Sequence, residues 1–335
     1  MVLTVKPSRS FSDELLDQYR QQGDIPADTV ITSIVEAEGP TGLHTLMRWL
    51  ADVDNVTTID QPLAVQRFFE QYAHLPDWAD QSRMKRSMDV FQKHDRLIGL
   101  LLGCYSLPYC YLGAQGAQVL WLTERIKHDT KRRLQETSEW VYAVNNPKEW
   151  ATGKAIIRTL KVRLIHAGVR WYTLRSNRWD MAWGHPVNQE DMAGTNGAFS
   201  YIVLRGLRKS GITLSEQQEE DYLHHSNVIG FLNGVATELL PQNLREAYHL
   251  DRAISRRHFT TSEAGIGLTS SLLNAIAAGI PDLSSNQRPE TLRNLAAGEM
   301  RFFLGDTYAD WLGIPNAPVE KRIAGLLNRF PIFPL

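Results

Sequence analysis

Apolar residues recur at intervals of three and four along almost the whole chain, which is the spacing of one face of an α-helix. The pattern predicts one long helix over residues 82–105 and another over residues 154–175, where apolar side chains occupy more than one side. No run of five or more residues alternates between apolar and polar. The best strand-like run, residues 30–35, has no second strand to pair with. The sequence therefore predicts an all-α protein.

Two further helices are indicated by their boundaries. Residues 191–206 keep the helical spacing, and Ser215 with Gln218 three residues later matches a capping box, which predicts that a helix begins at residue 216 and runs to about residue 240. No repeat or low-complexity linker divides the 335 residues. The simplest organisation is a loosely attached N-terminal arm (residues 1–35), a single helical domain (residues 36–325) and a C-terminal tail (residues 326–335).

Composition narrows the possible partners. The formal net charge of −1 gives no general attraction for nucleic acid. The two cysteines, Cys104 and Cys110, have the spacing of neither a zinc site nor a disulfide scaffold. We expect both to be small, buried apolar residues. No apolar run approaches the ~18 residues of a membrane span. The N-terminus lacks the apolar core of a signal peptide, so we expect a cytoplasmic protein.

The sequence lacks the motifs that are typical of nucleotide-binding sites and hydrolases. The sequence contains no GxSxG, no P-loop, no HExxH and no GxGxxG after a strand. The adjacent pair His224 and His225 points to different sides of a helix, so it cannot hold one metal ion from one side. These observations leave sites that need only one well-placed side chain.

His166 is the residue that fits such a site. It lies in the predicted helix 154–175, with Arg163 and Arg170 about one turn away on either side. A lone histidine on a largely apolar helix is most often a core residue. The alternative is an axial ligand to the iron of a haem, whose propionates need cations such as these two arginines.

The helix before it carries a second polar group. Arg133 and Thr137 are four residues apart and therefore share a face, where they offer a guanidinium and a hydroxyl to one pocket. The competing interpretation is that Arg132 and Glu136, also four apart, simply form a surface ion pair.

Three ordered segments carry a family resemblance: RRLQETSEWV at residues 132–141, VRLIHAGVR at residues 162–170 and GHPVNQED at residues 184–191. Together they resemble the MpaB-like and latex-clearing-protein family, the rubber oxygenase catalytic domain. The resemblance covers roughly residues 91–241.

The resemblance implies a single helical domain with a globin-like core that binds haem b, flanked by additional helices. It implies that His166 is the proximal iron ligand and that Arg133 and Thr137 line the distal side. The family's distal lysine falls on Glu136, which is a departure from the pattern. Arg163 and Arg170 remain candidates for binding the cofactor.

The expected function is thus a haem-dependent oxygenase that uses dioxygen. Because the family's extracellular members carry export signals and this chain shows none, a smaller isoprenoid or another unsaturated lipid is expected rather than rubber. One alternative is a non-catalytic haem-binding sensor or carrier, motivated by Glu136. The other is an all-α scaffold or lipid-binding protein in which His166 is structural.

Overall fold

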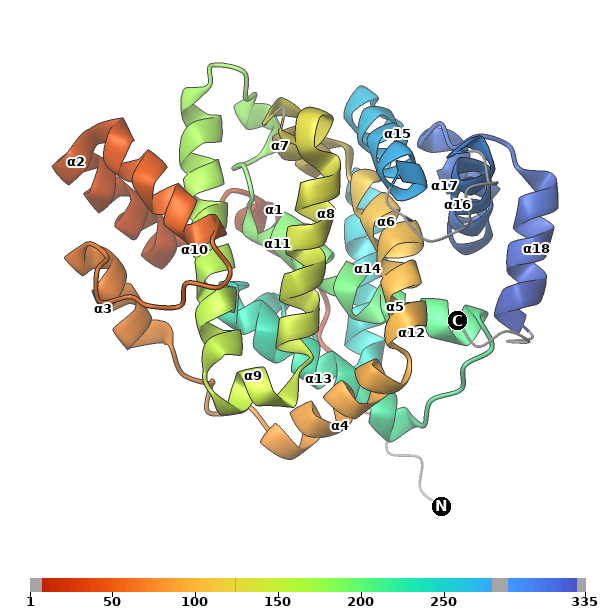
Figure 1. The fold of residues 1–335 in the computed structure, drawn as a ribbon, viewed down its shortest axis with the longest axis horizontal. Coiled ribbons are helices and arrows are strands. Elements are labelled where there is room, and N and C mark those ends of the chain that lie inside the picture. The colour runs from red at the N-terminus through yellow and green to blue at the C-terminus, as the bar shows by residue number, and fades with distance from the viewer. Residues whose placement is uncertain (1–7, 124, 279–288, 330–335) are drawn as a thin grey trace.

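The computed structural model describes residues 8–123, 125–278 and 289–329 (Figure 1). Within these ranges the chain is helical and contains no strand, only one isolated bridge between Gly113 and Phe259. The helices are α1 (Asp13–Arg20), α2 (Ile25–Ala51), α3 (Leu63–Tyr72), α4 (Gln81–Lys93), α5 (Asp95–Leu101), α6 (Leu107–Tyr111), α7 (Ala114–Leu122), α8 (Arg125–Val144), α9 (Pro147–Ala151), α10 (Lys154–Arg175), α11 (Gln189–Phe199), α12 (Tyr201–Lys209), α13 (Glu216–Leu232), α14 (Leu244–His258), α15 (Glu263–Ala278), α16 (Pro289–Leu304), α17 (Asp306–Trp311) and α18 (Pro318–Arg329).

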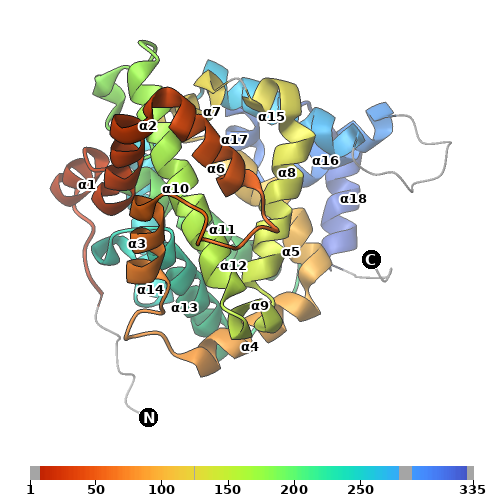
Figure 2. The same cartoon turned by 60° about the vertical axis from the view of Figure 1, so that its left-hand side comes forward.

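Helix α10 is the long central element, and α2 packs along it (Figure 2). The two helices approach closely at Gly168, where a Cβ atom would lie 2.5 Å from the sulfur of Met47. Buried side chains from α2, α3 and α10 form one apolar core between them. A larger apolar core lies on the other side of the molecule. It is formed by side chains of α5, α6, α7, α12, α15, α16 and α17. Helix α10 is thus held mainly by its neighbour α2.

Several predicted elements are confirmed. The all-α class holds for the described residues, and α10 has the predicted bounds of residues 154 and 175. Ser215 begins α13 with the predicted capping box, in which its side chain and that of Gln218 each accept a backbone N–H of the other residue. Cys104 is buried, Cys110 is partly buried, and both are free thiols.

Other boundaries differ from the predictions. The helix predicted over residues 82–105 is broken at His94 into α4 and α5, and a π-helical turn follows at Leu102–Ser106. The helix predicted over residues 191–206 is divided at Ser200 into α11 and α12. Helix α13 ends at Leu232 rather than near residue 240. The strand-like run at residues 30–35 is helical, because its apolar side chains fit the face of α2 that meets α10.

The N-terminal segment, expected to be a loosely attached arm, is largely helical. Residues 13–35 form α1 and the first part of α2, and the boundary expected at residue 35 lies inside α2. Of the expected tail, residues 326–329 continue α18, and residues 330–335 lie outside the described part of the chain. Among the described helices, none combines the length and apolar composition that crossing a membrane requires.

One buried histidine gives a pH dependence that can be tested. His225 on α13 donates its Nε2–H to the carbonyl oxygen of Val144 at 2.9 Å, and its Nδ1 atom is buried without a partner within residues 8–123, 125–278 and 289–329. Burial lowers the pKa of His225 to about 4, against the effect of the Val144 hydrogen bond. The unfolded chain therefore takes up a proton between pH 6.5 and pH 4 that the folded protein excludes, and stability falls as the pH falls through this window.

We expect His225→Gln, whose amide can still donate to Val144, to reduce this loss. Between pH 7 and pH 5 the free energy of unfolding should fall by roughly 2 kcal/mol less in the variant than in the parent protein. Denaturant titrations at the two pH values measure the difference. Equal losses in both proteins would show that His225 is charged at pH 5 in the folded state.

Candidate functional site

His166 lies in the middle of α10, and one nitrogen of its ring is in an unusual environment. Its side chain is partly buried, yet the Nδ1 atom has no contact with solvent and no hydrogen-bond partner among the residues that the structure describes. Burial lowers the pKa of His166 to about 4, and the positive charges of Arg170 and Arg133 lower it further while Asp24 opposes them. The imidazole is therefore neutral at pH 7, which is the state that binds a metal.

Arg133 on α8 comes level with His166. The short helix α9 joins α8 to α10, and the two long helices run in opposite directions (Figure 1). Trp140 of α8 donates to the Thr159 hydroxyl of α10 at 3.3 Å. Arg133 lies seven residues before Trp140, and His166 lies seven residues after Thr159. Because both helices rise about 1.5 Å per residue, the two side chains reach the same height on facing sides.

The other two residues predicted on α8 lie on different parts of its surface. Thr137 is partly buried and shares the inward stripe of Arg133 and Trp140, since these positions are four and seven residues apart. Glu136 lies at the edge of that stripe, 37% exposed, and its carboxylate pairs with Arg132 at 2.9 Å. Helix α8 thus carries both features that its sequence suggested as alternatives, an inward polar stripe and a surface ion pair.

The guanidinium of Arg163 is paired with a carboxylate of the protein. Its Nε and Nη2 atoms donate to the two carboxylate oxygens of Asp24 at 2.6 and 2.8 Å, and both side chains are less than a tenth exposed. The guanidinium also lies over the ring of Tyr72 at 4.7 Å. This two-point pair connects α10 to the residue before α2.

Arg170 is also paired with a carboxylate of the protein, but one nitrogen of its guanidinium makes no hydrogen bond to the described residues. Its Nε atom donates to Asp28 of α2 at 2.6 Å, and Nη1 donates to the carbonyl oxygen of Val187 at 3.1 Å. The Nη2 atom is buried and has no partner in the described part of the chain, although the side chain is only 1% exposed. An arginine held this way can still donate a hydrogen bond from Nη2 to one anionic oxygen.

The segment at residues 184–191 supports these pairs. Gln189 donates to the carbonyl oxygens of Gly23 and Gly234, both at 2.9 Å, and accepts from the backbone of Ala236. Gly184 has φ +89°, and a Cβ there would meet Arg20 at 2.6 Å. The segment therefore fixes the residue before Asp24, the partner of Arg163, and the turn at Gly234 that lies beside the Asp24 carboxylate.

Glu190 in this segment is fully buried, and its carboxylate is surrounded by basic side chains. It accepts from Arg20 at 3.2 Å, from Arg257 at 2.8 Å and from His258 at 2.8 Å. Although burial raises its pKa, the hydrogen bonds from His258 and Arg257 lower it below the ordinary value. Glu190 is thus an anionic anchor that ties α1, α11 and α14 together.

Sequence reasoning missed Asp24 and Asp28, which hold the two arginines beside His166. A signal was present, because Asp24 and Asp28 are four residues apart at the start of α2 and Arg163 and Arg170 are seven apart on α10. Each pair therefore falls on one helix face. The match between the two faces only becomes visible once the helices are packed.

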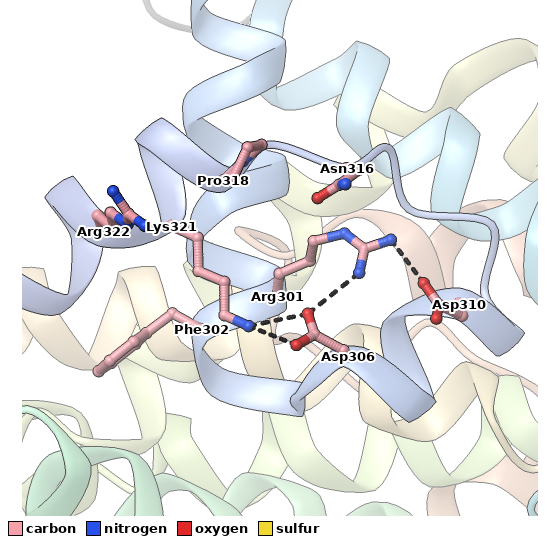
Figure 3. Close-up of a pocket in the computed structure, with 8 residues that line it drawn as sticks. All are labelled: Arg301, Phe302, Asp306, Asp310, Asn316, Pro318, Lys321 and Arg322. Atoms are coloured by element: carbon pink, nitrogen blue, oxygen red, sulfur yellow. Dashed lines mark hydrogen bonds and ion pairs between the residues drawn. The ribbon is translucent and has the colours of Figure 1, made fainter.

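Two hollows lie away from His166. One, of about 570 Å³ between α16, α17 and α18, is shown in Figure 3. Four of its five charged lining residues pair with one another, Arg301 with Asp306 and Asp310, and Lys321 with Asp306. The other, of about 630 Å³, is lined by acidic and basic side chains of α5, α8, α9 and α10. Neither of these two is an apolar cavity beside His166.

No group of three or more histidine, cysteine, aspartate or glutamate side chains in the described residues could hold a bare metal ion. A metal carried by a macrocycle needs no such group, since one axial nitrogen is enough. The geometry around His166 offers that nitrogen, with cationic groups on the same helix and on the facing helix.

Comparison with known proteins identifies the class. Residues 99–330 match the family model described as ER-bound oxygenase mpaB/B'/Rubber oxygenase, catalytic domain. The chain belongs to this family of oxygenases.

Two individual relatives agree with this assignment. The chain is 22% identical to the rubber oxygenase of Streptomyces sp. (strain K30) over 304 residues, which is 90% of this chain and 72% of the relative. The fold is similar to the structure of latex clearing protein LCP in the closed state, with a TM-score of 0.77 and 21% identity. That similarity covers 94% of this chain and 85% of the other. The single helical domain expected from the sequence is thereby confirmed as the latex-clearing-protein fold.

Proposed function

We propose that this oxygenase depends on haem b and acts on an apolar unsaturated substrate of isoprenoid or lipid type, with His166 as the iron ligand. One observation carries the proposal: His166 presents a neutral imidazole with a buried nitrogen that no group of the described protein uses. Buried polar atoms without a partner are uncommon in folded proteins, and they call for an explanation such as a bound group.

The haem would supply the binding and activation of dioxygen. The chain's own residues do the remaining work. The Arg133 guanidinium stands level with His166 and brings a fixed positive charge to a place where negative charge develops on oxygen. The Thr137 hydroxyl lies on the same stripe, where it can donate a hydrogen bond. Arg170 Nη2 is the free donor suited to a carboxylate of the macrocycle, whereas Arg163 is expected to hold α10 through Asp24.

The apolar substrate is proposed from two considerations. The named relatives act on rubber or clear latex, as their names state. Activated oxygen also requires a site from which water is excluded, and such a site favours an apolar substrate. Together with dioxygen, an alkene of moderate length is the substrate class that we propose.

Absorption spectroscopy tests the cofactor and oxygen uptake tests the reaction. The purified protein, or the protein reconstituted with haemin, should show a Soret band with about one haem per chain. The loaded protein should then consume oxygen steadily with a short polyisoprenoid or an unsaturated lipid. Absence of the Soret band after reconstitution would refute the proposal and favour a scaffold in which His166 is structural.

The second candidate, a non-catalytic haem sensor or carrier, is favoured by Glu136. Its carboxylate occupies the position of the family's distal lysine and is paired with Arg132 instead. A Soret band without oxygen consumption above the haemin blank would support this candidate. Sustained turnover over many cycles would eliminate it.

Glu136→Lys tests whether position 136 faces the bound group. We expect the ferric spectrum of the reconstituted variant to change toward a six-coordinate low-spin form, because an amine nitrogen is a strong-field ligand. The exposed Arg132–Glu136 pair contributes only about 0.3–0.5 kcal/mol, so the variant should fold normally. Glu136→Gln is the control and should keep the parent spectrum. An unchanged spectrum in both variants would place position 136 away from the iron.

A further inference from the structure

Four oxidisable rings lie in a row in and beside the larger apolar core, and the proposed reaction does not use them. Tyr105 belongs to the π-helical turn before α6, and Tyr109 belongs to α6. Tyr308 and Trp311 belong to α17. The ring centroids of Tyr105 and Tyr109 are 6.0 Å apart, and those of Tyr109 and Tyr308 are 6.4 Å apart. The Trp311 ring follows at 5.4 Å from Tyr308. We call these four residues the aromatic row.

The aromatic row runs from the interior of the protein toward solvent. Its first two rings are 4% and 7% exposed, whereas the two rings on α17 are only partly buried. The buried rings belong to the core against which Leu134 and Trp140 of α8 pack. Trp140 lies on the inward stripe of α8 that also carries Arg133. The aromatic row therefore begins in the core that adjoins the candidate site.

The hydroxyl of Tyr109 is bound to a carboxylate inside the protein. It donates to Asp251 Oδ1 of α14 at 2.7 Å, and the Asp251 side chain is only 11% exposed. Arg205 of α12 approaches the other carboxylate oxygen at 3.5 Å. Burial raises the pKa of Asp251, against the hydrogen bond from Tyr109 and the charges of Arg205 and Arg252. Asp251 therefore binds a proton more readily than an exposed aspartate does, and it touches a phenol.

The Tyr109 phenol keeps its proton as long as it keeps its electrons. Burial raises the pKa of Tyr109, and the negative charge of Asp251 raises it further. Loss of one electron reverses this preference, because an oxidised phenol is a strong acid that passes its proton to a nearby acceptor. Asp251 is such an acceptor, already placed at hydrogen-bond distance. The pair is thus built for the loss of an electron and a proton together.

We propose that Tyr109 is a redox-active tyrosine and that Asp251 is its proton acceptor. Tyr109 gives one electron to an oxidising species that an oxygenase forms from dioxygen, and it gives its phenolic proton to Asp251 Oδ1. A neutral phenoxyl radical and a neutral carboxylic acid result, and the oxidant is reduced by one electron.

The rest of the aromatic row returns the protein to its starting state. A reductant of the ascorbate class gives up one electron and one proton at the surface. The electron reaches the phenoxyl radical through Trp311 and Tyr308, the proton of the reductant goes to water, and the Asp251 proton returns to Tyr109. The row thereby removes oxidising equivalents that are not spent on substrate. This role rests on the oxygenase class of the chain, and it requires neither haem b nor a particular substrate.

Photochemical oxidation of the full chain, without added haemin, tests the pair. Illuminated tris(bipyridine)ruthenium(II) with persulfate supplies a one-electron oxidant. The parent protein should form a long-lived neutral tyrosyl radical, seen by electron paramagnetic resonance of frozen samples, and Tyr109→Phe should remove it. Asparagine still accepts the Tyr109 hydrogen bond but cannot take up its proton, so Asp251→Asn should slow radical formation at least about a hundredfold. Trp311→Phe should slow the decay of the radical on addition of ascorbate severalfold.

Tyr222→Phe is the matched control, because Tyr222 is a buried tyrosine of α13 outside the aromatic row. It should give the parent radical yield and lifetime. 3-Fluorotyrosine placed at position 109 keeps the hydroxyl and should add a fluorine splitting to the signal, so the assignment does not depend on the folding of Tyr109→Phe.

Three results would overturn the proposal. They are the absence of a long-lived tyrosyl radical in the parent, a radical that persists in Tyr109→Phe, and a radical that forms in Asp251→Asn at the parent rate. The oxidant is supplied from outside, so a Soret band and oxygen uptake without the tyrosyl radical would leave the proposed function intact.

Discussion

Under the proposed function, the His166→Ala protein is expected to fold but to bind far less haem than the parent protein. After reconstitution with haemin and removal of unbound cofactor, the haem content per chain should fall at least about tenfold relative to the parent. The reason is that the variant deletes the neutral imidazole whose Nδ1 atom is bound by none of the described residues. Soret absorbance divided by protein concentration measures the effect, and added imidazole should restore part of the band.

The matched control is His44→Ala, an exposed histidine on the outer side of α2. It should retain the parent haem content. Circular dichroism must show native helicity in both variants, so that loss of haem is not confused with unfolding. If His166→Ala keeps both the Soret band and the parent stability, His166 is neither the iron ligand nor an important structural residue.

Asp24→Asn should strongly destabilise the folded protein. It leaves the Arg163 guanidinium buried without its carboxylate, and removal of one member of a buried pair costs about 3–5 kcal/mol. Denaturant unfolding of the cofactor-free protein measures the change. Since Arg163 lies one turn from His166, the haem content should fall as well.

Two further variants serve as comparisons for Asp24→Asn. Arg256→Gln removes a pair with Asp13 in which the side chains are 67% and 48% exposed, and it should change stability by less than about 1 kcal/mol. Adding Arg163→Met to Asp24→Asn should recover part of the loss, because the uncompensated charge is removed. A loss below about 1 kcal/mol in Asp24→Asn would mean that water reaches Arg163 in the folded protein.

The fold could be predicted where the cause is local. The bounds of α10 follow from apolar residues at helical spacing, and the start of α13 follows from the Ser215 capping box. The break at His94 and the division at Ser200 had no such cause in the sequence, since neither position carries a proline or glycine. Packing against neighbouring helices decides these points, and a pattern read along one segment does not contain it.

The candidate site shows the same division. His166, Arg133 and Thr137 were selected from short segments of sequence, and the structure brings Arg133 level with His166. Asp24 was not selected, because it lies 139 residues from Arg163 and its segment had the pattern of a loose arm. Spacing identifies residues that share a face, but it cannot identify which distant face they meet.

The arrangement of α8, α9 and α10 has a consequence for how the protein assembles. The two sides of the candidate site come from one helical hairpin, so Arg133 and His166 are separated by only a short stretch of chain. Contacts close in sequence form quickly, whereas distant ones wait for larger loops to close. We therefore expect the hairpin to form before Asp24 and Asp28 bind α10. Although the N-terminal segment emerges before the hairpin during synthesis, it would dock after the hairpin has formed, and it would complete the site rather than begin it.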